Sequence, residues 1–165
     1  MKTPICNLCV KSGVLCSGCE DKLGKGKISQ LDVDVSRTLN ALSTRFNLDA
    51  AEFAKAIDLG RVILILTRGE VGVLIGKEGK VVSELSQTLG KKVRIAEISG
   101  DMRKTISDVV MPAKLVGINT IFREGERTYK VRLLRSEIRA LPVDINTLEK
   151  ALYSLLDAKV NIVFE

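Results

Sequence analysis

The chain has 165 residues, of which 45% are hydrophobic, enough to build the core of one ordinary domain or of two small ones. Its 26 basic residues against 20 acidic residues give a net charge of +6, which fits a polyanionic partner without requiring one. The sequence contains no histidine, no apolar run long enough to cross a membrane and no signal-peptide core. We therefore exclude histidine-based catalysis and expect a cytoplasmic protein with no membrane partner.

All four cysteines lie near the start of the chain, in two Cys-x2-Cys pairs that six residues separate. Two such pairs can supply four thiolates to one ion, the closed tetrahedral shell of a structural Zn²⁺ site. Disulfides are the main alternative, which a chain expected in the cytoplasm disfavours, and an iron–sulfur cluster would use the same ligands. The sequence thus predicts a zinc module over residues 1–22, then a charged, glycine-containing linker over 23–30. The expected metal ligands are Cys6, Cys9, Cys16 and Cys19.

Two helices and a strand are predicted next. Ser29, with Asp32 three residues on, is typical of a helix start, and apolar residues at helical spacing continue to Leu42. A similar cap predicts a second helix over residues 49–57. The uninterrupted apolar run Val62–Leu66 is typical of a central strand that is covered on both faces.

A pair of glycines, Gly76 and Gly79, follows this strand with two residues between them. Their missing Cβ atoms let the backbone turn sharply and leave room for another backbone, such as that of a nucleic acid. The helix predicted over 80–89 starts at this turn, so its N–H groups would face a bound phosphate, and Lys77 and Lys80 would add positive charge. The alternative is that the glycines make only a tight corner between helices.

A strand predicted over 93–98 completes an order of strand, helix, glycine turn, helix and strand. This order, with Ile-Gly-x-x-Gly-x-x-Val-x-x-Leu across the turn, resembles the KH domain, whose loop clamps about four nucleotides of RNA backbone. The resemblance implies an RNA-binding domain over residues 31–100. It implies an aliphatic groove, a phosphate-binding turn in which Glu78 must point to solvent, and a hydrogen-bond donor on the edge strand. The residues expected to bind RNA are Ile75, Gly76, Lys77, Glu78, Gly79, Lys80, Val82 and Arg94.

The second half of the chain predicts the same kinds of element. The expected helices cover 101–111, 137–141 and 144–156, and the expected strands cover 115–123, 127–135 and 160–164. This α-β-β-α-α-β order is that of a type 2 KH domain. At the loop position, however, the chain has Leu141, Pro142, Val143 and Asp144, so both glycines are missing, proline lacks an N–H and the aspartate would repel phosphate. We expect a degenerate KH-like domain over 101–165.

Two KH domains in tandem, with almost no linker, resemble the RNA-binding part of the NusA family of transcription elongation and termination factors. The stretch 101–116, which ends in Pro-Ala-Lys-Leu-Val, is similar to the family's helix between its two KH units. The Ile-Gly-Lys-Glu-Gly turn is similar to its KH loops. The resemblance covers about residues 58–165 and is greatest to the short archaeal relatives, although the cysteine module and the lost second loop depart from that pattern.

These observations predict an α+β protein, with a small four-cysteine zinc module followed by two packed type 2 KH domains. The expected function is non-catalytic binding of single-stranded RNA in transcription elongation or termination, with RNA polymerase as a partner and no small-molecule substrate. The alternatives are a ribosome-associated protein that binds rRNA, and an adaptor whose zinc module binds other proteins. An enzyme is not expected, because histidine and a suitable carboxylate pair are missing. Basic residues of the second half either extend the RNA surface or form one solvated face: Arg123, Arg127, Lys130, Arg132, Arg135 and Arg139.

Overall fold

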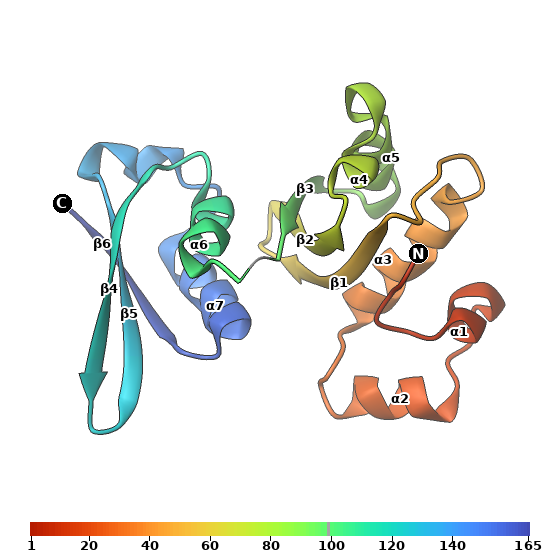
Figure 1. Cartoon of the computed structure of the whole chain (residues 1–165), viewed down its shortest axis with the longest axis horizontal. Coiled ribbons are helices and arrows are strands. Elements are labelled where there is room, and N and C mark those ends of the chain that lie inside the picture. Colours follow the sequence, from red (N-terminus) through yellow and green to blue (C-terminus); the bar gives the residue numbers. More distant parts are fainter. Residues whose placement is uncertain (99) are drawn as a thin grey trace. The chain divides into compact units, whose positions relative to one another are not determined.

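The computed structural model describes residues 1–98 and 100–165, and the chain divides into two compact units (Figure 1). Unit 1 comprises Met1–Asp58 and Ile63–Ile98, and unit 2 comprises Leu59–Val62 and the chain from residue 99 onward. Each unit holds one three-stranded sheet with its own helices, so the chain has the expected α+β fold. None of the described helices is long and apolar enough to cross a membrane.

Unit 1 begins with two short helices that carry the cysteines and continues in the order α-β-β-α-α-β. Its sheet has the strand order β1-β2-β3, in which β1 and β2 are antiparallel. The elements are α1 (Asn7–Ser12), α2 (Ser17–Gly24), α3 (Gln30–Leu42), β1 (Ala51–Asp58), β2 (Val62–Gly69), α4 (Gly72–Ile75), the 3-10 turn η1 (Lys77–Gly79), α5 (Lys80–Leu89) and β3 (Lys92–Glu97).

Residues 49–57, predicted as a helix, mostly belong to strand β1, so that prediction was wrong. The strand pairs with β2 from Ala51 opposite Gly69 to Asp58 opposite Ile63. Alanine, glutamate and lysine favour helices locally, but the edge of strand β2, buried from Val62 to Thr67, offers backbone hydrogen bonds that local propensity cannot outweigh. The correction gives unit 1 the complete α-β-β-α-α-β order that the sequence predicted only for the second half.

Helix α3 begins with the predicted capping box and is tied to β1 by the same carboxylate. The backbone N–H of Asp32 donates to Ser29 Oγ (3.1 Å), and the N–H of Ser29 donates to Asp32 Oδ2 (2.9 Å). The N–H of Ala56 in β1 donates to the other oxygen, Oδ1, at 2.7 Å. Because Asp32 is only 2% exposed, this carboxylate is a buried polar link between helix and sheet.

The core of unit 1 lies between its sheet and helices α3 and α5. Leu74 of α4 and both Val81 and Leu85 of α5 are buried in it, so the helices that flank the glycine turn are anchored from below. Strand β2 is buried on both faces from Val62 to Thr67, as the apolar run predicted. The packing of α4 and α5 on this core therefore fixes the position of the turn between them.

A second, smaller core holds the cysteine-bearing segment against α3. Ile5, Val10, Ile28 and Val33 are buried together with two of the cysteines. The segment predicted as a linker, 23–30, thus starts within α2 and contains one of these buried residues. The exact domain boundaries stay a prediction.

Unit 2 repeats the order of unit 1 with a 3-10 helix in place of α4. Its antiparallel hairpin β4–β5 continues into a parallel β5–β6 pair, and the expected elements are confirmed to within a few residues. The elements are α6 (Met102–Val110), β4 (Leu115–Arg123), β5 (Glu126–Leu133), η2 (Arg135–Ala140), α7 (Ile145–Leu156) and β6 (Lys159–Phe164).

Candidate nucleic-acid interface and metal centre

The glycine turn between α4 and α5 has a backbone that ordinary residues adopt only with strain. Gly76 takes φ 79° and ψ 170°, a region almost restricted to glycine, and Gly79 takes φ 73°. Glu78 is also left-handed, with φ 57°. A Cβ on Gly76 would lie 2.6 Å from Val81 Cγ2, so glycine is needed there for space as well as for backbone freedom.

The turn presents its side chains to solvent. Lys77, Glu78 and Lys80 are exposed, and Ile75 is 41% exposed although it is a large apolar residue. No ion pair engages Lys77 or Lys80 within the described residues. No side chain among the described residues caps the start of α5, although the Lys80 N–H donates to the Lys77 carbonyl oxygen, and the positive end of that helix lies next to the two lysines.

The remaining predicted groove residues lie on the elements beside the turn. Val82 is half-buried on α5, with its Cγ1 3.8 Å from where a Cβ on Gly79 would be. Arg94 is half-buried on β3, the strand against which α5 packs. The structure brings Ile75, Val82 and the turn together, while the contribution of Arg94 to binding stays a prediction.

The sequence did not predict an open hollow of about 630 Å³ on the turn. Phe46 and Asn47, which follow α3, line it together with Gly76, Lys77 and Val81. Nothing in the sequence pattern marks Phe46 and Asn47, because they approach the turn only through the packing of α3 on α5.

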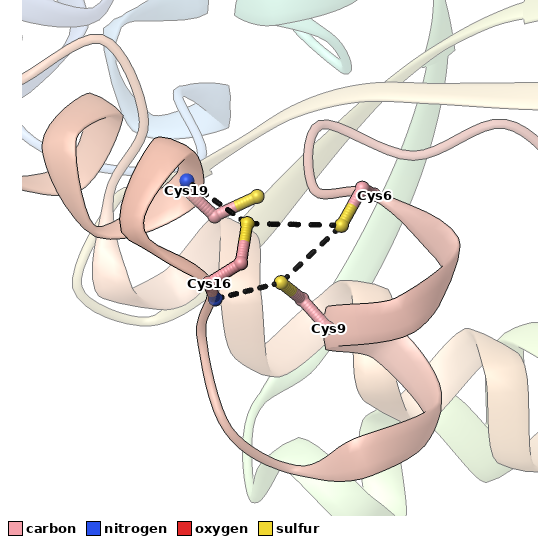
Figure 2. A group of neighbouring side chains, drawn as sticks. All are labelled: Cys6, Cys9, Cys16 and Cys19. Carbon is pink, nitrogen blue, oxygen red and sulfur yellow. Dashed lines mark hydrogen bonds between the residues drawn. The ribbon is translucent and has the colours of Figure 1, made fainter.

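The four cysteines converge between α1 and α2, which Figure 2 shows as facing segments. Their Sγ atoms all lie within 4.8 Å of one another, and those of Cys6 and Cys9 are 3.3 Å apart. Four thiolates around one tetrahedral ion with bonds of about 2.3 Å would be about 3.8 Å apart. The donor set therefore fits a single metal ion.

Backbone amides support the sulfur cluster and set its charge. The N–H of Cys16 donates to Cys9 Sγ (3.0 Å), and the N–H of Cys19 donates to Cys16 Sγ (3.5 Å). The Cys19 amide, followed by the thiols of Cys9 and Cys19, lowers the pKa of Cys16 to about 7. Although the Cys16 amide opposes the change, burial and neighbouring thiols raise the pKa of Cys9 to about 12. The lowered pKa favours the thiolate form of Cys16, whereas Cys9 stays protonated without a metal. A bound cation would displace the remaining thiol protons.

Comparison with known proteins agrees with this geometry. Residues 43–110 match the family model described as KH domain, which spans the sheet of unit 1, the glycine turn and α6. The chain therefore carries a KH domain.

Within this class, part of the chain is similar to proteins named NusA. A stretch of 55 residues is 44% identical to the "Probable transcription termination protein NusA" of Methanocaldococcus jannaschii, and 29% identical to the protein of the same name from Methanococcus vannielii. These matches cover 33% of this chain and 30% and 32% of the two relatives, so the aligned region is about a third of each protein. A solved structure, described as that of APE1850, has a similar fold with a TM-score of 0.57 and 18% identity, and the match covers 78% of this chain and 96% of that one.

Proposed function

We propose that the chain is a non-catalytic protein that binds single-stranded RNA through the glycine turn of unit 1. The observation that carries this proposal is the turn itself. Within the described part of the chain, it combines a backbone that only glycine permits at Gly76, two exposed lysines without an ion pair, and an uncapped helix start. A phosphate placed there would meet N–H groups and positive charge at once.

Of the proposed role in transcription elongation or termination, the termination part is supported by the names of the two relatives. Co-sedimentation of the metal-loaded protein with purified RNA polymerase, and in parallel with ribosomal subunits, tests this role. Binding to polymerase is the expected result. Binding to ribosomal subunits alone would instead indicate a role on the ribosome.

The test of RNA binding is a double variant, Lys77→Asp with Glu78→Asp. Both glycines stay, and aspartate tolerates the left-handed backbone at position 78 better than glutamate, so the turn should keep its shape. Affinity for single-stranded RNA should fall at least about tenfold, or about 1.4 kcal/mol. The control is Lys150→Asp, which makes the same change of charge at an exposed position of α7. Equal affinities of the two variants would mean that the turn does not bind RNA and only connects the two helices.

The cysteine cluster is proposed to hold one structural Zn²⁺. The spacing of the sulfur atoms supports a single ion over a multi-iron cluster, and four protein ligands leave no open position for a substrate. Metal analysis should find one zinc per chain. Iron with visible absorption in freshly purified protein would instead assign an iron site.

A further inference from the structure

The sheet of unit 2 has one face that helices cover and one face that stays open. Along β5, Tyr129, Val131 and Leu133 are buried, whereas Thr128, Lys130 and Arg132 alternate with them and are exposed or half-buried. Helices α6 and α7 pack against β4 and β6, which accounts for the buried set. The alternate side chains form what we call the open sheet face.

Strand register brings polar groups from all three strands together on this face. Lys130 lies between Asn119 of β4 and Asn161 of β6, and Thr128 lies beside Lys159. All of these residues except Asn119 border a hollow of about 490 Å³. Its lining residues are Ile121, Arg123, Glu124, Glu126, Thr128, Lys130, Lys159, Asn161 and Val163.

The charge on this face is unevenly placed. Arg123, Lys130 and Lys159 make no ion pair within the described part of the chain. The two carboxylates, Glu124 and Glu126, lie at the hairpin end. The middle of the face therefore presents uncompensated positive charge beside amide groups.

Arg132 is a fixed neighbour rather than a further free cation. Its Nη1 lies 3.0 Å from Glu165 Oε1, and its guanidinium fills the space above Gly117, where a Cβ would overlap it. Arg127, in contrast, points to the other face, where it contacts Phe122 and donates to Tyr129 Oη. The basic residues of the hairpin therefore do not all share one face.

We infer that the open sheet face is a second site for single-stranded RNA, in which Lys130 and Lys159 hold phosphates and the amides of Asn119 and Asn161 meet base edges. This inference rests on the proposed function and adds a site outside the glycine turn. Lysine with two amides suits phosphates and base edges, because amide groups both donate and accept hydrogen bonds. A protein partner is less well matched, since the described residues that line the hollow include no aromatic anchor.

The first test measures the salt dependence of binding to an unstructured uridine oligonucleotide. The variant Lys130→Glu with Lys159→Glu is compared with Lys114→Glu with Lys150→Glu, which changes the charge equally at exposed positions outside the face. The logarithm of the binding constant falls with the logarithm of the salt concentration, and the loss of two phosphate contacts should make this negative slope shallower by about 1.4. The control variant should keep the slope of the parent chain. Equal slopes would overturn the inference.

The second test locates the RNA by NMR. Adding the oligonucleotide should shift the side-chain amide signals of Asn119 and Asn161, but not that of the exposed Asn146 on α7. The same titration is run on the Lys77→Asp, Glu78→Asp variant. This variant should lose binding at the turn, but the Asn119 and Asn161 signals should still shift when RNA is added. If the turn variant binds like the parent chain while Asn119 and Asn161 still shift, the function proposed for the turn fails and the sheet site stands.

A polyglutamate peptide of similar length serves as the competitor. It should leave the Asn119 and Asn161 signals unmoved, because it offers carboxylates without base edges. Shifts of equal size with polyglutamate would assign the face to an acidic protein and overturn the RNA site. Shifts with neither ligand would also overturn it.

Discussion

Units 1 and 2 have the same order of elements, but they differ in which surface stays open. The central strand β2 of unit 1 is buried on both faces, whereas the central strand β5 of unit 2 alternates between buried and exposed residues. Unit 1 keeps a glycine turn before α5, and unit 2 has Leu141 to Asp144 before α7. The same fold can therefore offer a loop in one copy and a sheet face in the other.

The starts of α5 and α7 make the contrast concrete. Gly79 precedes α5 and provides no capping side chain, so the helix end can receive an external anion. Asp144 precedes α7, and its own carboxylate accepts from the Thr147 N–H at 3.0 Å. In unit 2, an internal carboxylate thus caps the helix start that in unit 1 has no side-chain cap.

The largest expected effect separates the units by their dependence on metal. Cys9 is fully buried, and its Sγ contacts Cys6 Sγ and accepts from the Cys16 N–H. Cys9→Ser should therefore abolish zinc binding and disorder residues 5–28. Structural zinc contributes about 10–16 kcal/mol in small peptides, far more than so small a core can replace. Amide NMR spectra should show the loss in this segment while signals of unit 2 keep their positions.

Exposed Ser17→Ala, next to the cluster but not a ligand, is the matched control and should bind one zinc. If Cys9→Ser also displaced the signals of unit 2, the two units would not fold independently.

The next effect compares the contacts that hold α3 in unit 1 with those that hold α6 in unit 2. Asp32→Ala removes the acceptor of two amides, of which the Ala56 N–H is buried, and should destabilise unit 1 by roughly 3 kcal/mol. Asp101→Ala removes an exposed cap of α6 and should cost about 1 kcal/mol in unit 2. Urea unfolding followed by amide signals of each unit measures both values. Equal losses would mean that the Ala56 contact adds nothing.

Local chemistry made most elements of both units predictable. The Ser29–Asp32 box lies within four neighbouring residues and is present, and the helices expected near residues 101 and 144 and the two strands joined at residues 124–125 are also found. The four cysteines likewise predicted their own convergence through spacing alone.

The misassigned segment 49–57 shows what local chemistry leaves out. Its alanines and charged residues fit a helix, and only pairing with β2 makes it a strand. The open sheet face is similar, since Asn119, Lys130 and Asn161 are far apart in the sequence and meet through register. Alternation of polar with apolar residues over 128–133 was the available signal, but it does not say which face stays uncovered.

A smaller effect should distinguish the two glycines of the turn. Gly76→Ala meets both the Val81 side chain and a backbone region closed to alanine, so it should destabilise unit 1 by roughly 2–3 kcal/mol. Gly79→Ala has room for its methyl group and only left-handed strain, which costs about 1 kcal/mol. Thermal unfolding of the two variants gives the ranking. A larger loss at Gly79 would contradict both the backbone argument and the packing argument at Gly76.

The smallest effect tests whether the negative charge of Asp144, rather than the shape of its side chain, stabilises the start of α7. The Thr147 hydroxyl and then its N–H hold the pKa of Asp144 below its usual value. Because the folded pKa is lower than the unfolded one, the carboxylate stabilises unit 2 above about pH 4 and loses this contribution as pH falls through the folded pKa. Asp144→Asn should therefore lower the urea midpoint of unit 2 at pH 7, and the difference from the parent chain should shrink as the pH falls through the folded pKa.

The control is Asp157→Asn at the other end of α7. Asparagine accepts the left-handed backbone there, and removing a negative charge from a helix C-terminus is not destabilising, so no loss at neutral pH is expected. A difference at Asp144 that persisted unchanged in acid would attribute the loss to the shape of the side chain. The start of α7 would then be closed to phosphate by Pro142 and the turn backbone, and the carboxylate would not be what distinguishes it from the start of α5.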